Sequence, residues 1–293
     1  MTTLTTKDLP ARDTPPDAPA PPVLALRDVR VTDRAGGREI VHGVGFELTP
    51  GKTVGIVGES GSGKTLTCRA ALGILPAHFE ISGGTIEIEG TDIATLTPAR
   101  WTRLRGAVVS AVFQDPASYL NPSVKVGAQI AEVVRVKLGR KRREARRRAV
   151  ELLAAVRLRD PELVYGQYPF ELSGGMLQRV LIAAAVAAGP RVLVADEATT
   201  ALDVTVQAEI LDLLAELRER TGLALVVVSH DLAVVAQLCD EVLVMRHGEV
   251  VEQGPTRSVL ADPRHEYTRL LVAEHEQYGL EKFRTAHPFE ETP

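Results

Sequence analysis

The sequence predicts an α/β fold whose parallel sheet is joined by an antiparallel β-subdomain and an inserted helical subdomain. A glycine-rich segment at 58–65 separates a short β-branched run from a helix-compatible stretch, which is the order strand, loop, helix. A continuous apolar run at 192–195 has the composition of a strand that is buried on both faces of a sheet. Between these two features, the pattern from about 115 to 188 is helical.

The outer parts of the chain are predicted from composition. Residues 1–22 are rich in Pro, Thr, Asp and Ala and have little to bury, which predicts a disordered N-terminal tail. We place one folded domain at 23–275, with the helical subdomain at about 115–188, and a C-terminal tail at 276–293. Alternating apolar and polar residues predict antiparallel strands at 24–31, 44–48 and 85–89.

The segment between a predicted strand at 53–57 and a predicted helix at 64–75 matches a phosphate-binding P-loop. Its residues are Gly58, Glu59, Ser60, Gly61, Ser62, Gly63, Lys64 and Thr65. The glycines let backbone N–H groups turn toward an anion, and the N-terminus of the following helix adds its positive dipole end. Lys64 would reach the β- and γ-phosphates of a nucleotide, and Thr65 would offer its hydroxyl to Mg²⁺.

The apolar strand predicted at 191–196 ends in two carboxylates, Asp196 and Glu197. Open α/β sheets bind ligands at the carboxyl ends of their strands, so Asp196 is suited to the magnesium shell and Glu197 to orienting an attacking water. Two solvated acids at a strand end would be the plainer interpretation, but the P-loop in the same chain favours the functional one.

The chain after this pair continues the alternation of helices and strands. Apolar residues at helical spacing predict an amphipathic helix at 203–220, which Gly222 ends. Further elements are predicted as a strand at 107–113, a strand at 224–229, a helix to 238, a strand at 241–245, a hairpin at 246–249 and two C-terminal helices.

Five motifs in one order resemble the ATP-binding cassette (ABC) ATPases. The P-loop is followed by Gln114 in Val-Phe-Gln-Asp-Pro, by Leu-Ser-Gly-Gly at 172–175, by Leu202-Asp203, and by His230 after Val-Val-Val-Ser. The resemblance covers about 23–275 and implies an enzyme that binds ATP with Mg²⁺ and hydrolyses it.

The resemblance also implies roles for single residues. Gln114 would join Thr65 and Asp196 around Mg²⁺, while His230 would support the γ-phosphate beside the catalytic Glu197. In the family, the signature segment serves the nucleotide that is bound by a partner subunit. The remaining nucleotide-binding residues that the resemblance implies are Ser173, Gly174, Gly175 and Asp203.

Longer phrases at 113–122, 172–179 and 262–271 resemble the oligopeptide and dipeptide importer branch, whose members also include nickel and metallophore importers. This branch implies a second homologous ATPase subunit, two membrane permeases and, indirectly, an extracytoplasmic solute-binding protein. The chain would then sit peripherally on the cytoplasmic face of the membrane. A soluble ABC ATPase of DNA repair or translation is the alternative, although such proteins tend to carry two cassettes, a coiled-coil insertion or zinc cysteines. The Leu-Ser-Gly-Gly segment at 172–175 also argues against a P-loop kinase.

Composition is consistent with this class. The net charge of -4 argues against nucleic acid as a partner, and no apolar run approaches the roughly 18 residues of a membrane span. The N-terminus has no apolar core of a signal peptide, so we expect a cytosolic chain that reaches membranes only through partners. Cys68 and Cys239 are isolated from each other, and we predict no iron–sulfur site.

Two features leave open questions. Residues 135–148 contain nine basic side chains and one acid, which we interpret as a solvated helix face rather than a site for anionic lipid or nucleic acid. Asp33 stands roughly 25 positions before the P-loop, where members of the family usually have an aromatic residue that stacks on adenine. We therefore expect weak discrimination between ATP and GTP, with Arg34 or Arg38 as a substitute platform.

Overall fold

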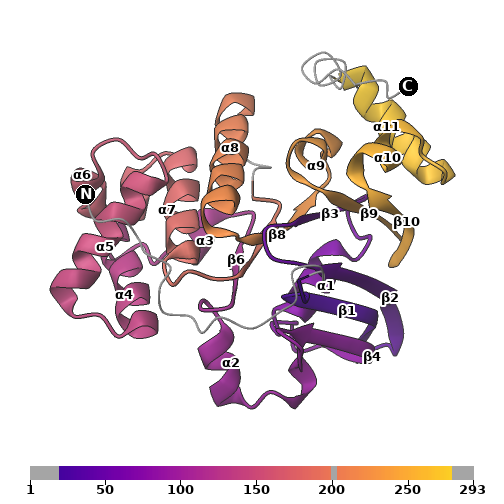
Figure 1. Ribbon diagram of the computed structural model, residues 1–293, viewed down its shortest axis with the longest axis horizontal. Helices are drawn as coiled ribbons and strands as arrows, with labels where there is room; N and C mark the ends of the chain where they lie inside the picture. The colour runs from indigo at the N-terminus through magenta and orange to yellow at the C-terminus, as the bar shows by residue number, and fades with distance from the viewer. Residues whose placement is uncertain (1–19, 199–202, 279–293) are drawn as a thin grey trace.

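The computed structural model describes residues 20–198 and 203–278. These residues form a central sheet, an antiparallel β-subdomain and a helical lobe (Figure 1). The predicted α/β fold class is confirmed. Parts of the predicted tails, residues 1–19 and 279–293, lie outside the described residues, and α11 runs across the predicted boundary at 275.

The central sheet has six strands in the order β10-β9-β3-β8-β7-β6. Every neighbouring pair is parallel except β9 with β10. The carboxyl ends of β3, β8, β7 and β6 therefore meet at one edge of the sheet, where parallel sheets bind ligands. The strands are β3 Thr53–Val57, β6 Val109–Val112, β7 Val192–Asp196, β8 Ala224–Ser229, β9 Glu241–Arg246 and β10 Glu249–Pro255.

Both faces of this sheet are covered, which explains why β3, β7 and β8 consist entirely of buried residues. On one face, Ile56, Val194 and Val226 pack with the β-subdomain and with α1, Lys64–Ala71. On the other face, Leu193 and Val227 pack with helices α7, α8 and α9. The bounds of β3 and β8 agree with the predicted strands, because a continuous apolar run is typical of a strand without a solvated face.

The antiparallel β-subdomain has the strand order β2-β1-β4-β5. Its strands are β1 Leu24–Asp33, β2 Arg38–Leu48, β4 Phe79–Ile88 and β5 Thr91–Asp92. Strands β2 and β4 each begin six residues before the predicted starts at 44 and 85, which were therefore wrong. Bulges interrupt the alternation of side chains, since the β1–β2 and β1–β4 pairings shift register around Asp28. Short segments follow, η1 Ile93–Thr95 and α2 Pro98–Leu104. Helix α2 was not predicted because it has no buried residue, hence no apolar periodicity.

The helical lobe and the C-terminal helices lie at opposite ends of the molecule in Figure 1, and both contribute to the core on the same face of the central sheet. Its helices are α3 Pro116–Tyr119, α4 Val126–Leu138, α5 Arg142–Ala155, α6 Pro161–Tyr165, η2 Pro169–Glu171 and α7 Gly174–Val186. In the basic stretch, ion pairs join Arg135 to Glu132, Arg146 to Glu162, and Arg148 to Glu151. These pairs agree with the interpretation of 135–148 as a solvated face.

The last part of the chain returns to the sheet. Asp203 caps α8, Val204–Thr221, by accepting a hydrogen bond from the Val206 N–H, and Gly222 ends the helix at a φ of 67°. The remaining helices are α9 Leu232–Leu238, α10 Thr256–Ala261 and α11 Glu266–Tyr278. Within the described part of the chain, no helix combines the length and the apolar character needed to cross a bilayer.

Candidate nucleotide-binding site

The P-loop leaves the carboxyl end of β3 and enters α1 at Lys64, as the sequence predicted. Its three glycines all have a positive φ, and two of them show most clearly why. Gly63 has a φ of 98° at the N-cap of α1, and a Cβ on Gly58 would lie 2.1 Å from the carbonyl oxygen of Met245. Side chains rarely tolerate such positions, so the loop depends on these glycines to keep its tight turn.

Lys64 lies inside the loop that precedes it. Its Nζ donates hydrogen bonds of 2.7 Å to the carbonyl oxygens of both Gly58 and Glu59, and it lies 3.4 Å from Ser62 Oγ. Only 4% of the residue is exposed, and this burial lowers the pKa of Lys64, while the nearby Glu197 and Asp196 carboxylates oppose the shift. A cation held among backbone groups at the start of a helix is an arrangement suited to phosphates.

Two oxygens that suit Mg²⁺ lie beside this lysine. The Thr65 hydroxyl donates to Asp196 Oδ1 at 3.2 Å, which joins the start of α1 to the end of β7. Burial raises the pKa of Asp196, and the hydrogen bond from Thr65 partly offsets this effect. Hydroxyl and carboxylate oxygens are ligands that Mg²⁺ prefers, so these residues fit the ion. Gln114 follows β6, the strand beside β7, and its side chain is exposed.

Glu197 and His230 come from neighbouring strands. Glu197 directly follows β7 in the left-handed region at a φ of 51°, and its N–H donates to the Val228 carbonyl of β8. His230 follows β8, and its Nδ1 lies 4.0 Å from Glu197 Oε1. A glutamate at positive φ is uncommon, and such positions cluster at functional sites. The structure therefore brings together the two residues that the sequence predicted as catalytic.

The signature residues lie apart from this cluster. Ser173 caps α7 by accepting from the Met176 N–H at 3.4 Å, and both Ser173 and Gly174 are exposed. A Cβ on Gly175 would lie 2.7 Å from Val206 Cγ1 of α8, so this glycine lets the two helices approach closely. Among the described residues, no hydrogen bond or ion pair connects 173–175 with the P-loop.

Asp203 is exposed and its carboxylate caps α8. Its predicted neighbour in the motif, Leu202, falls in 199–202, outside the described residues. The roles of Gln114, of 173–175 and of Asp203 toward a nucleotide stay predictions.

The surroundings of Asp33 contain aromatic rings that the sequence did not reveal. Asp33 ends β1 opposite Phe79 of β4, and the rings of His78 and Phe79 lie in contact, with centroids 4.2 Å apart and planes tilted by 44°. These rings are about 45 positions away in the chain, and only strand pairing brings them near. Arg34 forms an ion pair with Glu80, which competes with its predicted use as a platform for adenine. Weak base discrimination stays a prediction.

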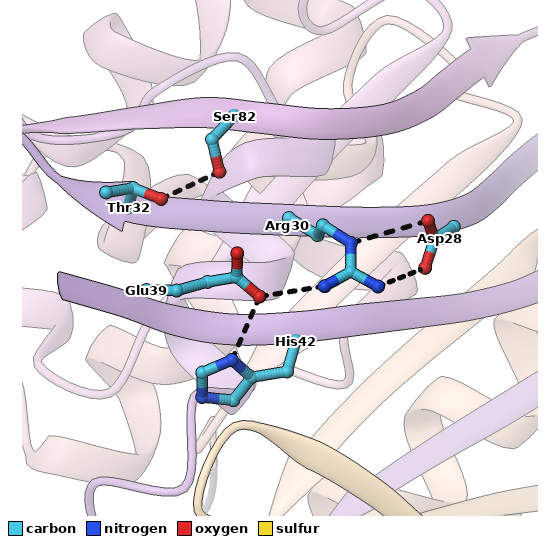
Figure 2. A network of polar contacts seen from close by, with 6 residues as sticks. All are labelled: Asp28, Arg30, Thr32, Glu39, His42 and Ser82. Carbon is cyan, nitrogen blue, oxygen red and sulfur yellow. Dashed lines mark hydrogen bonds and ion pairs between the residues drawn. The ribbon is translucent and has the colours of Figure 1, made fainter. Parts of the chain in front are cut away.

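The solvated face of the β-subdomain carries a polar network next to this corner (Figure 2). Figure 2 shows Glu39 between Arg30 and His42. Glu39 Oε1 accepts a hydrogen bond from Arg30 Nη1 at 3.0 Å and lies 2.9 Å from His42 Nδ1, while Arg30 Nη2 donates to Asp28 Oδ1. The network fixes His42, whose backbone N–H donates to the Gly248 carbonyl. Gly248 in turn donates its N–H to the Ser62 carbonyl, so the β-subdomain and the β9–β10 hairpin both support the P-loop.

Comparisons with known proteins agree with this geometry. The family model described as ABC transporter matches residues 41–200. The oligopeptide transport ATP-binding protein OppD of Bacillus subtilis is 43% identical over 256 residues, covering 86% of this chain and 71% of the relative. The dipeptide transport ATP-binding protein DppD of Escherichia coli is 40% identical over 258 residues, covering 88% of this chain and 79% of the relative.

Among solved structures, the dimeric ATP-binding cassette MJ0796, bound to ADP and phosphate in a post-hydrolysis state, superposes with a TM-score of 0.70. It is 28% identical, and the match covers 80% of this chain and 99% of that one. The fold and the site define a P-loop enzyme that binds and hydrolyses ATP. The chain belongs to the ABC transporter family, as an ATP-binding cassette.

Proposed function

We propose that this chain is the ATP-hydrolysing subunit that powers an importer of peptides or similar small solutes. One observation carries the proposal: the P-loop, the Asp196-Glu197 pair and His230 converge at the carboxyl ends of three adjacent strands, β3, β7 and β8. The names of OppD and DppD, which describe transport of oligopeptides and dipeptides by those proteins, support the choice of cargo.

In this proposal each residue of the cluster has one task. Lys64 and the P-loop N–H groups bind the β- and γ-phosphates, while Thr65, Asp196 and Gln114 hold Mg²⁺, which would neutralise phosphate charge. Glu197 orients and polarises the attacking water, and His230 supports the γ-phosphate. Phosphoryl transfer depends mainly on positioning and charge stabilisation, which is what a preformed loop and fixed strand ends supply.

The signature segment serves a second subunit. Ser173 and Gly174 are exposed and, in the part of the chain that the structure describes, have no hydrogen bond to their own P-loop, which is expected if they complete the site of a partner. MJ0796 was solved as a dimer. We propose a heterodimer with a homologous ATPase subunit that is docked on two membrane permeases at the cytoplasmic face, with an extracytoplasmic binding protein that delivers the solute. The cassette would span 23–275, with its helical subdomain at about 115–188.

Uptake measurements test the cargo. Cells that lack this chain are expected to lose import of a labelled oligopeptide, and the wild-type chain should restore it. Lys64→Ala should not restore it, because the phosphates lose their main cation. Lys141→Ala, at an exposed lysine on the helical lobe, is the matched control and should restore import.

The same cells separate the alternatives. Nickel uptake should be unchanged by the deletion. Lost nickel uptake with intact peptide import would instead support a nickel or metallophore importer. Unchanged import of both solutes would remove oligopeptides and nickel as the cargo.

A further inference from the structure

The C-terminal helix α11 reaches back to the nucleotide site. Tyr267, in the first turn of α11, is only 2% exposed, and its phenol oxygen accepts a hydrogen bond of 2.8 Å from the backbone N–H of Glu59. Glu59 is the second residue of the P-loop, and 208 positions of sequence separate the two partners. Tyr267 lies in the phrase at 262–271 that resembles the importer branch, but none of the five motifs that predicted the nucleotide site includes it, and it lies outside the matched range of 41–200.

The position of the tyrosine is fixed from two sides. The Glu252 carboxylate of β10 accepts hydrogen bonds from the N–H groups of Arg264 and His265, just before α11 begins. The Arg246 guanidinium lies over the Tyr267 ring at 4.8 Å from its centroid, an attractive cation–π arrangement. Tyr267 therefore presents its oxygen to the P-loop from a rigid support.

Glu59 connects this support to the phosphate-binding lysine. Its N–H donates to Tyr267, and its C=O accepts from Lys64 Nζ at 2.7 Å. Both polar groups of the Glu59 backbone are thus used, one on each side of the loop. Two carbonyl oxygens orient Lys64, one from Gly58 and one from Glu59. A displacement of the Glu59 peptide would move the second of them.

We propose that Tyr267 is a positioning residue for nucleotide binding, which acts through Glu59 to hold Lys64 and the P-loop in the shape that receives phosphates. The inference rests on the proposed function of the P-loop. It assigns α11, which lies outside the five motifs of the nucleotide site, a part in the affinity of the enzyme for nucleotide.

The test is Tyr267→Phe in the full-length chain. This change keeps the ring under Arg246 and removes the hydroxyl, which accepts from the Glu59 N–H and also interacts with the Glu59 carboxylate. Loss of a buried acceptor should weaken binding of Mg·ADP by about tenfold, which equals about 1.4 kcal/mol, as measured by isothermal titration calorimetry. The matched control is Tyr165→Phe, since the Tyr165 hydroxyl has no hydrogen bond among the described residues. Its affinity should equal that of the wild type.

Thermal unfolding without nucleotide separates positioning from a merely structural role. We expect Tyr165→Phe to unfold at the wild-type temperature and Tyr267→Phe about 2–4 °C lower, because the Glu59 N–H loses its acceptor while the domain stays folded. Wild-type affinity in Tyr267→Phe, or an equal loss in both variants, would overturn the inference. A wild-type chain that binds no Mg·ADP would instead contradict the proposed function.

A measurement on the wild-type chain covers the case in which Tyr267→Phe does not fold. The Glu59 amide proton should be protected from hydrogen exchange without nucleotide, because it is bonded to a buried oxygen. Exchange at the rate of an unprotected amide would overturn the inference.

Discussion

Glu197→Gln is expected to bind ATP normally and to hydrolyse it at least about 10²-fold more slowly, which is the usual contribution of a positioned general base. The amide keeps the size of the carboxylate but cannot accept the proton of the attacking water. In the proposed mechanism the site opens only after hydrolysis, so the variant should accumulate as closed, ATP-bound dimers. Single-turnover hydrolysis and size-exclusion chromatography with ATP measure both effects.

The control for this variant is Glu219→Gln, which makes the same change at an exposed position of α8. It should hydrolyse ATP at the wild-type rate. Near-normal turnover in Glu197→Gln would remove Glu197 from its proposed role, and the left-handed backbone at this residue would need another explanation.

Ser173→Arg is expected to leave nucleotide binding to the isolated chain nearly intact and to abolish most hydrolysis at the P-loop of the partner subunit. The new side chain would occupy the space that an opposing γ-phosphate needs. Mixed dimers in which one P-loop at a time carries a Lys→Ala change locate the defect. If the loss follows the Lys64 site of the same chain, the assignment of the signature to the partner is wrong.

Two controls accompany Ser173→Arg. Ser258→Arg adds the same cation at an exposed residue of α10 and should leave hydrolysis at the P-loop of the partner subunit unchanged. Ser173→Ala removes the cap of α7, which costs about 1 kcal/mol of stability, without adding bulk. Its hydrolysis should exceed that of Ser173→Arg.

The site could be predicted from sequence wherever its residues are neighbours in the chain. The P-loop is set by eight consecutive residues between a buried strand and a helix, and Asp196-Glu197 by the strand that they end. The convergence of β3, β7 and β8 follows from the parallel sheet, since such strands share one ligand-binding edge.

The parts that were missed depend on contacts between distant segments. Tyr267 and Glu59 are partners across 208 positions, and Phe79 faces Asp33 only because β1 pairs with β4. No local pattern predicts these contacts. The early starts of β2 and β4 were missed for a related reason, because the bulges around Asp28 and Gly84 break the two-residue period on which strand prediction depends.

We claim that this chain supplies half of each composite ATPase site in the proposed dimer, so turnover requires a partner. The most direct measurement is the ATPase rate per chain of the purified protein across a wide range of concentrations, alone and with the homologous subunit and permeases. The isolated chain should be nearly inactive at low concentration and should gain activity with the partner proteins. Full turnover that does not depend on concentration, from the purified chain alone, would contradict the claim.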